Sequence, residues 1–548
     1  MRHASQLVLL IVMLQGVPGA EENDTALRTR AELTRFTETS RAEDVTRVLS
    51  ALERASSSVY VTEFGRSPEA RPLPLAVVST PGVKDAATAK RTGKPRVLVL
   101  ANIHAGEVEG KEAALILARR LTLGDLRSLT SRLVVLFAPL YNVDGNERIS
   151  LDHRPEQFGP LGGVGTRENA AGLDLNRDFT KLETPESRAL ARLLTEWDPQ
   201  VVIDLHTTNG SYHAYHLTYS PTLAVGADPR LVEFTRGMLS TATRTLESEG
   251  WRTHAYGNFT TEGQLERSQE RPAMPGAGAT AWRTFDCRPR FVTNGVGLRN
   301  RIAILSEAYS YLAFDRRIEV TEAFVESMLA QVARRGPEVK TLIDELDRET
   351  VAAGGRGMLG PLGTSGQIAP FSAGASPILV GDVETRINPR SGRTMTVMKE
   401  TTARQQLMQE YGYFLPVDAV LAPRAYAVVA DGTNAVERIR TLLALHGIRT
   451  ERVASPRAVA AEAVVTGAVV RSERAMQGHE EIRLTNIRRE RRTLSLPAGS
   501  LIVPMDQPLA RLAFHLLEPT SDDGVVNWNF LDEWIAEGKD VPIFRVLQ

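Results

Sequence analysis

Between about residues 30 and 330 the chain alternates short apolar segments with amphipathic ones, and this alternation restricts the possible folds more than any other feature. The apolar segments are β-rich: SVYVTEFG, LPLAVVS, RVLVLANI, LVVLFAP, VVIDLHT and RIAILSE. Between them lie helical patterns such as GKEAALILARRLTLG, ESRALARLLTEW and PRLVEFTRGMLSTATRTLESEG. Strands that are apolar throughout and separated by amphipathic helices are typical of a sheet covered on both faces. We therefore predict an α/β fold with a mixed, mostly parallel sheet flanked by helices on both faces.

The chain has 548 residues, which are too many for one ordinary domain. We expect a main domain over residues 21–340, a Gly-rich linker over 341–360 and a smaller C-terminal region over 361–548. The linker prediction depends on the run GGRGMLGPLGTSGQ. The C-terminal region has short β-like runs and a strand–helix–strand unit, AYAVVADGTNAVERIRTLLALHGIRTERV. It is therefore predicted to be α+β or β-rich, with a further break near residue 420.

The first 20 residues have the pattern of a signal peptide. Arg2 and His3 precede a short apolar run from Leu7 to Leu14, and small residues follow before the acidic sequence EEND. The run is too short to span a bilayer. No later segment reaches the roughly 18 consecutive apolar residues that a membrane helix needs. We predict export to the periplasm or secretion, and no membrane span.

Charge and cysteine content exclude several kinds of partner and site. The formal net charge is -1, so no general attraction to nucleic acid is expected, and we predict no nucleic-acid partner. The one cysteine, Cys287, cannot form an intramolecular disulfide or a Cys-based zinc site. We expect it to be a small packing residue.

Side chains that can bind a metal stand at the ends of three predicted strands. His104 and Glu107 follow RVLVLANI, His206 ends VVIDLH, and Glu307 ends RIAILSE. In open α/β sheets, ligands gather beyond the carboxyl ends of the strands, so these four groups should converge. Two histidines and one carboxylate with an open fourth position suit a catalytic zinc. A second carboxylate, not coordinated, can then take a proton from the bound water.

This ordered set resembles the zinc carboxypeptidase family (peptidase M14, funnelin type), in a bacterial-type member with a C-terminal accessory region. The family pattern is H-x-x-E after one strand, a distant His after another and a catalytic Glu after a third. An N-R dipeptide preceded by D-x comes before the second His. Here TRENAAGLDLNRDF supplies Asp174, Asn176 and Arg177. The resemblance covers about residues 40–330 and implies the zinc carboxypeptidase fold.

The resemblance also implies the chemistry of the site. One Zn²⁺ per chain would be bound by His104, Glu107 and His206, and Glu307 would be the general base. The implied activity is that of an exported metallocarboxypeptidase, which hydrolyses the C-terminal peptide bond of a peptide by zinc-activated water.

The remaining matched residues are implied to act on the substrate or on a zinc ligand. Asn176 and Arg177 would hold the free C-terminal carboxylate of the peptide, a task that suits the planar fork of an arginine. Arg167 matches the arginine that polarises the scissile carbonyl and stabilises the oxyanion. Asp174 matches a carboxylate that orients a zinc-bound histidine.

Two positions depart from the digestive members of the family. Those enzymes carry an Arg between the His and Glu of the first motif, where this chain has Gly106, so one substrate-side charge is missing. They also have a mobile tyrosine upstream of the base, and this chain has no tyrosine between Tyr256 and Tyr309. Tyr256, Tyr309 and Tyr311 are the candidates for that role, which could also be unfilled. Both departures favour, as an alternative, a zinc amide hydrolase of the same fold that acts on N-acyl amino acids or cell-wall peptides.

Two further interpretations of the sequence are less favoured. His213 and His216, in SYHAYHLTY, could form a rival metal pair. Their separation of three places them on opposite faces of a strand, so we expect ordinary roles for both. A non-catalytic binding protein with the same fold is the alternative of a different class. It is disfavoured because the three ligands and the base are all present.

Overall fold

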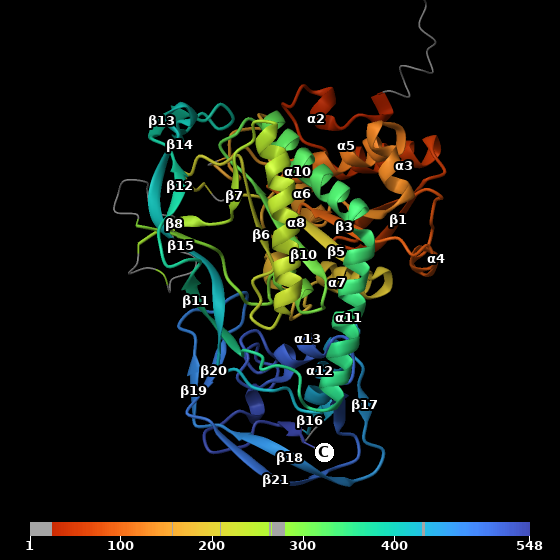
Figure 1. The fold of residues 1–548 in the computed structure, drawn as a ribbon, viewed down its shortest axis with the longest axis vertical. Coiled ribbons are helices and arrows are strands. Elements are labelled where there is room, and N and C mark those ends of the chain that lie inside the picture. Colours follow the sequence, from red (N-terminus) through yellow and green to blue (C-terminus); the bar gives the residue numbers. More distant parts are fainter. Residues whose placement is uncertain are drawn as a thin grey trace, which may run out of the picture.

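The computed structural model describes residues 25–155, 157–208, 210–261, 265, 280–429 and 433–547. The predicted signal peptide, residues 1–20, lies outside the described residues. Figure 1 shows an upper lobe that contains a long sheet between helices and a lower lobe that contains the C-terminal strands. Helix α11 (Gly336–Gly355) runs along the side of the molecule from the first lobe to the second.

The upper lobe is built on an eight-stranded sheet with the strand order β1-β2-β4-β3-β5-β10-β6-β7. The central strands β4, β3, β5 and β10 run parallel to one another, and β7 runs parallel to β6. The pairs β1–β2, β2–β4 and β10–β6 are antiparallel. The strands are β1 (Val59–Arg66), β2 (Pro72–Val78), β3 (Arg96–Ala101), β4 (Val134–Ala138), β5 (Val201–Thr207), β6 (Leu217–Pro221), β7 (Thr253–Ala255) and β10 (Ile302–Ala308). The predicted mixed, mostly parallel sheet is confirmed.

Helices cover both faces of this sheet, as predicted. Successive residues of β3 face opposite cores: Val97 and Val99 belong to one buried cluster, and Leu98 and Leu100 to another. This explains why the central strands are apolar throughout. The first core is completed by α3 (Ala42–Ala55), α5 (Glu109–Leu123), α8 (Pro229–Ser248), α10 (Phe314–Arg334) and α11, and the second by α4 (Ala86–Arg91), α7 (Pro185–Trp197) and α9 (Val292–Gly297). The short helix α6 (Val143–Glu147) adds Val143 to the first core, and α2 (Arg30–Leu33) belongs to a separate small cluster through Ala31.

A second, smaller sheet joins the upper lobe to the first part of the C-terminal region. Its longest strand, β15, runs parallel to β9 and antiparallel to β11 and β12. A separate hairpin, β13–β14, precedes it. The bounds are β8 (Asn258–Thr260), β9 (Ala281–Arg283), β11 (Ser365–Pro370), β12 (Ser376–Val380), β13 (Val383–Ile387), β14 (Thr394–Met398) and β15 (Arg404–Val417). Residues 365–417 are therefore part of the same structure as the main domain.

The lower lobe contains a six-stranded sheet with the order β17-β22-β16-β23-β18-β21. Helices α12 (Thr433–Leu445) and α13 (Ala510–Leu517) and the two-stranded sheet β19–β20 complete it. The strands are β16 (Ala425–Val428), β17 (Glu451–Arg452), β18 (Arg457–Val465), β19 (Ala468–Arg471), β20 (Ile482–Thr485), β21 (Arg488–Leu496), β22 (Leu501–Pro504) and β23 (Ile543–Val546). The break expected near residue 420 falls between β15 and β16. The predicted β-rich character of this region is confirmed.

The linker predicted over residues 341–360 is wrong for most of its length. Helix α11 continues to Gly355, and only the last few residues are irregular. Gly354 lies so close to the lower lobe that an added Cβ would come within 1.9 Å of the carbonyl oxygen of Met505. This glycine therefore permits close packing of the helix and does not mark a flexible connection.

Buried ion pairs fasten the two lobes together. A guanidinium nitrogen of Arg290 lies 2.6 Å from a carboxylate oxygen of Asp523, and both side chains are fully buried. Arg511 of the lower lobe pairs with Asp228 at 3.0 Å.

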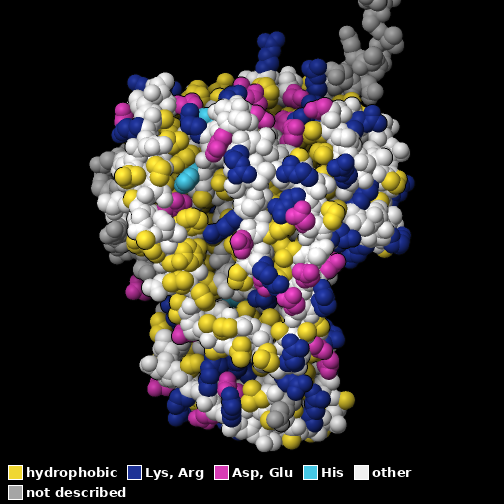
Figure 2. Space-filling view, in the orientation of Figure 1, with side chains coloured by type: hydrophobic (Ala, Val, Ile, Leu, Met, Phe, Trp, Pro, Cys, Tyr) yellow, Lys and Arg dark blue, Asp and Glu magenta, His cyan; other side chains and the backbone are white. Residues whose placement is uncertain are grey.

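In Figure 2, basic and acidic side chains are interspersed over the visible face of the upper lobe, which agrees with the net charge of -1. Within the described ranges, every helix is too short or too polar to cross a membrane.

Candidate functional site

The register of the central sheet sets the positions of the four candidate residues. β5 and β10 are parallel neighbours, and His206 stands directly opposite Glu307. On the other side of β5, Ala101 at the end of β3 pairs with Leu205. His104 and Glu107 follow that end, so all four residues lie at the same edge of the sheet.

A tight turn between β3 and α5 presents His104 and Glu107. Asn102 begins the turn with a left-handed backbone (φ 64°), a conformation that asparagine tolerates better than most residues. Its side-chain amide donates to the carbonyl oxygens of Ala105 and Glu107, at 3.3 Å each. The amide of Glu107 donates to the carbonyl oxygen of His104 at 2.9 Å. The turn is thereby held from within, with both side chains facing His206.

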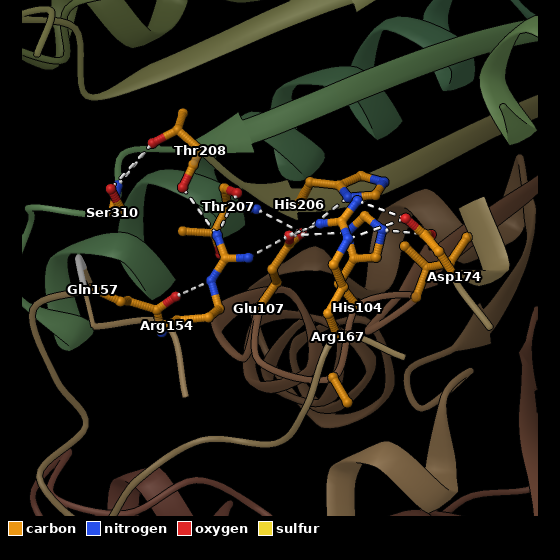
Figure 3. A network of polar contacts seen from close by, with 12 residues as sticks. His104, Glu107, Arg154, Gln157, Arg167, Asp174, His206, Thr207, Thr208 and Ser310 are labelled. Atoms are coloured by element: carbon orange, nitrogen blue, oxygen red, sulfur yellow. Dashed lines mark hydrogen bonds and ion pairs between the residues drawn. The ribbon is translucent and has the colours of Figure 1, made fainter. Parts of the chain in front are cut away.

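Glu107 contacts both histidines through its carboxylate (Figure 3). One of its oxygens is 2.9 Å from Nδ1 of His104, and the other is 2.9 Å from Nδ1 of His206. The candidate ligand atoms of the three residues lie within 4.8 Å of one another. All three side chains are almost fully buried. Two imidazole nitrogens and a carboxylate at this spacing are a suitable donor set for zinc.

A second pair of carboxylates lies behind the histidines. Nε2 of His104 is 3.1 Å from Asp174, and Nε2 of His206 is 3.0 Å from Asp204. Each imidazole therefore has a carboxylate oxygen at both nitrogens. A neutral imidazole carries only one N–H, so this arrangement requires positive charge, either on the rings or as a cation between Nδ1 and Glu107. His104, Glu107 and His206 could hold zinc through Nδ1 and the carboxylate, which would leave the Nε2–H groups facing the outer carboxylates.

The electrostatics of the site follow from the same arrangement. Burial opposes ionisation of Glu107, but His104 and Arg154 outweigh it and hold the pKa of Glu107 well below its usual value. Burial likewise opposes charge on His206, yet Asp204 and Glu107 raise the pKa of its ring well above the ordinary value. The protein thus keeps the carboxylate ionised and stabilises positive charge beside it.

Glu307 behaves differently from Glu107. Burial raises the pKa of Glu307 to about 8; His206 opposes the shift, and the nearby Glu107 carboxylate adds to it. A cation bound by the three candidate ligands would bring this pKa down again, because it would favour the ionised carboxylate. A carboxyl group whose pKa can be moved across neutrality is suited to accepting and returning a proton.

The predicted substrate residues cluster around Asp174. Arg167 donates to Oδ2 of Asp174 through Nε at 3.0 Å and Nη2 at 2.8 Å, and its Nη1 lies 3.8 Å from Glu107. Arg177 lies with its guanidinium 4.3 Å above the ring of Phe291 and donates to the carbonyl oxygen of Asn176. The side-chain oxygen of Asn176 accepts from the amide of Val292. Arg167 therefore faces the candidate metal site, whereas Arg177 and Asn176 lie beyond Asp174.

The three candidate tyrosines have different surroundings, and the hydroxyl of Tyr256 accepts from the side-chain amide of Asn258 at 3.4 Å. Burial raises the pKa of Tyr256, and the Glu307 and Glu107 carboxylates add to the effect, so its phenol lies within their electrostatic reach. Tyr311 instead donates to the carbonyl oxygen of Gly210. Tyr309 packs against His213 with ring centroids 4.5 Å apart.

The rival histidines have ordinary surroundings, as expected. His213 is packed against Trp282, and burial lowers its pKa to about 3. Nε2 of His216 lies 2.9 Å from Glu400. Among the described residues, His104, Glu107 and His206 form the one group of three or more His, Cys, Asp or Glu side chains that could hold a metal ion.

Two residues at the site were not predicted from the sequence. Asp204 precedes His206 by two positions on β5, so both side chains leave the same face of the strand. The D-x-H spacing could therefore have identified Asp204 as a partner of His206 from the sequence. Arg154 donates to Glu107 at 2.9 Å from the loop LDHRPEQF, which has no recognisable pattern.

Comparison with known proteins agrees with this geometry. A family model described as zinc carboxypeptidase, Peptidase_M14, matches residues 45–271. Residues 45–271 are therefore similar to the zinc carboxypeptidase family. The family match ends before Glu307, so the structure, through the pairing of β5 with β10, supplies the link between the matched ligands and that carboxylate.

Relatives and solved structures of carboxypeptidases are also similar to the chain. "Carboxypeptidase 2" of Trichophyton tonsurans is 23% identical over 510 residues, which cover 88% of this chain and 81% of that protein. "Carboxypeptidase E" of Caenorhabditis elegans is 32% identical over 138 residues, 24% of this chain and 27% of that one. A metallo-carboxypeptidase structure from Burkholderia cenocepacia has a TM-score of 0.37 at 18% identity and covers 53% of this chain and 69% of its own. The carboxypeptidase A structure from Helicoverpa armigera has a TM-score of 0.39 at 17% identity, over 57% and 80% of the two chains.

The candidate metal site leads to the first prediction. The purified protein should contain about one zinc ion per chain. His206→Ala should lose it, because two donors cannot hold the ion with comparable affinity. His216→Ala is the matched control and should keep full zinc content. Metal analysis of the three dialysed proteins is the measurement, and full zinc occupancy in His206→Ala would refute the ligand assignment.

Proposed function

We propose that the protein is an exported zinc metallocarboxypeptidase that hydrolyses the C-terminal peptide bond of its substrates. The observation that carries this proposal is the convergence of His104, Glu107 and His206, with Glu307 opposite His206 in the sheet. A donor set of three with an uncoordinated carboxylate beside it is what metal-assisted hydrolysis requires. The family match and the carboxypeptidase relatives support the same reaction class.

Each residue of the site has a defined task in this reaction. A zinc ion held by His104, Glu107 and His206 would supply Lewis acidity, which acidifies water and polarises a carbonyl group. Glu307 accepts the proton of the attacking water and then delivers it to the leaving amine. The outer carboxylates Asp174 and Asp204 fix the two imidazole rings by holding Nε2.

The arginines would act on the substrate. Arg167 lies between Asp174 and Glu107, so its guanidinium is placed to stabilise negative charge that develops on the scissile carbonyl oxygen. Arg177, stacked on Phe291, is proposed to anchor the terminal carboxylate together with Asn176. Tyr256 is the tyrosine proposed to assist, because its pKa responds to the Glu307 and Glu107 carboxylates.

One observation favours the alternative, a zinc amide hydrolase that acts on N-acyl amino acids or cell-wall peptides. Arg177 donates to the backbone of Asn176, and the side-chain oxygen of Asn176 is used by Val292. One guanidinium nitrogen of Arg177 is therefore already engaged within the protein, and the orientation of the Asn176 side chain is fixed through its oxygen. An enzyme that does not need to bind a free carboxylate would tolerate this arrangement. Peptides with a free C-terminus, compared with acylated amino acids and γ-linked peptides, distinguish the two activities.

The second prediction concerns the base. Glu307→Gln should keep its zinc and its fold, while kcat falls by about 10²–10⁴-fold, because the amide cannot accept the proton. Glu319→Gln changes an exposed carboxylate on α10 and is the control, with kcat expected to remain at the wild-type value. Turnover and zinc content are measured on the same preparations. A zinc-loaded Glu307→Gln protein with wild-type kcat would show that another residue is the base.

The third prediction separates exopeptidase from other hydrolase activity. Amidation of the C-terminus of a good substrate should lower kcat/KM by about ten- to several hundred-fold, because a hydrogen bond to a charged group contributes roughly 1.5–3 kcal/mol. Arg177→Met should cause a similar loss on the free acid and little further loss on the amide, since both changes remove the same contact. Equal cleavage of amide and acid by the wild type would favour the alternative activity, with the zinc site unchanged.

The fourth prediction concerns export. The short apolar run and the small residues before Glu21 predict removal of the first 20 residues or so. Mass spectrometry of protein recovered outside the cytoplasm should therefore give an amino terminus near residues 20–21. Recovery of exported protein that still begins at Met1 would contradict a cleaved signal.

A further inference from the structure

The backbone at Gly106, between the two ligands of the first motif, is covered by a side chain from a distant loop. A Cβ added at Gly106 would lie 2.6 Å from Cδ and 3.0 Å from Cγ of Arg154. It would also lie 2.9 Å from the carbonyl oxygen of Gly165. Glycine at this position therefore allows Arg154 to pass over the turn and reach the metal ligands.

The guanidinium of Arg154 connects the two segments that carry the candidate ligands, the β3–α5 turn and the end of β5 (Figure 3). Nη1 donates to Oε1 of Glu107 at 2.9 Å. Nη2 donates to the carbonyl oxygens of Thr207 and Thr208 at 3.0 Å each, and these residues come directly after His206. Nε donates to Gln157 at 2.9 Å. With every guanidinium nitrogen bonded to the protein and the side chain only 13% exposed, Arg154 is placed to hold the site and not to bind substrate.

The backbone of Arg154 is held in turn by the accessory hairpin β13–β14. Arg154 has a left-handed φ of 48°, a conformation that persists in a non-glycine residue only when its surroundings impose it. At the tip of the hairpin, Arg390 donates to the carbonyl oxygen of Arg154 at 2.5 Å, and Asn388 donates to that of Pro155 at 2.9 Å. Asn388 is 1% exposed. These contacts fix the direction in which the Arg154 side chain leaves the loop.

We propose that Arg154 is a positioning residue of the metal centre and that the tip of the β13–β14 hairpin holds it in place. The proposal rests on the zinc site proposed above. A fixed cation on Oε1 limits rotation of the Glu107 carboxylate and offsets part of the negative charge of Glu107, Asp174 and Glu307. The two bonds to residues 207 and 208 keep the end of β5, and therefore His206, at a constant distance from Glu107. Partners that orient metal ligands in this way typically contribute 10- to 100-fold to metal affinity or activity.

Zinc affinity tests the role of Arg154 without any activity measurement. The zinc dissociation constants of the wild type, Arg154→Met and Arg154→Lys are compared by competition with a chelator. Arg154→Met should bind zinc about 10- to 100-fold more weakly. Arg154→Lys keeps the charge but has a single donor group, so it should recover only part of the loss. Thermal unfolding of the zinc-free proteins, with similar midpoints expected, separates this effect from a general loss of stability.

The possible results distinguish this inference from the proposed function. Zinc binding by Arg154→Met within twofold of the wild type would overturn the positioning role and leave the zinc site intact. A wild type that binds no zinc would instead remove the site itself, and both proposals with it. Full recovery of affinity in Arg154→Lys would show that charge alone matters, which contradicts positioning by the bridged contacts.

The hairpin is tested by a matched pair of variants. Asn388→Ala removes the contact to Pro155. It should raise the zinc dissociation constant, as Arg154→Met does, but by a smaller factor. Arg386→Ala changes an exposed residue of the same hairpin and should leave the dissociation constant unchanged. Combining Asn388→Ala with Arg154→Met should add nothing to the loss from Arg154→Met, because both act through one side chain. Additive losses, or equal effects of Asn388→Ala and Arg386→Ala, would show that the hairpin does not act through Arg154.

Discussion

The structure around the site depends on one constraint: a buried carboxylate, Glu107, lies between two buried imidazoles whose outer nitrogens face further carboxylates. Such a group of charges is unstable in a protein interior unless positive charge balances it. The chain supplies part of the balance through arginines, with Arg154 on Glu107 and Arg167 on Asp174. A divalent cation held by the three candidate ligands would complete it. The need for compensation therefore explains the basic residues around these carboxylates and is consistent with a metal site.

The sheet makes this concentration of charge possible. Strands β3, β5 and β10 are buried on both faces, so their positions are fixed by packing and not by the polar groups at their ends. Their parallel register places His206 opposite Glu307 and brings the β3–α5 turn alongside. Polar residues at the carboxyl ends of such strands lie outside the apolar layers, where side chains from several loops can reach them.

The strand ends and the ordered polar motifs were sufficient to predict the α/β sheet and the convergence of His104, Glu107, His206 and Glu307. Each of these residues follows an apolar run whose period and length are local properties of the sequence. Arg154 could not be predicted, because its place is set by a left-handed turn and by contacts with residues more than 200 positions away. The linker prediction failed for a related reason. The glycines at the end of α11 were interpreted as a flexible linker. Gly354 is instead required because the lower lobe approaches the helix closely at this position, and the neighbouring sequence does not reveal that contact.

Long-range contacts connect the C-terminal region to residues around the candidate site. On one side, the β13–β14 hairpin binds the loop that carries Arg154. On the other, Gln477 of the lower lobe donates to the carbonyl oxygen of Asp174, and His479 pairs with Glu183. The lobe itself is fastened by the buried pair of Arg290 and Asp523, and breaking such a pair from one side typically costs 3–5 kcal/mol. Because Asp174 contacts His104 and Arg154 contacts Glu107, the C-terminal region is linked to the candidate ligands from two directions. Under the proposed function it is part of the framework of the site, because its contacts hold residues that touch the candidate ligands.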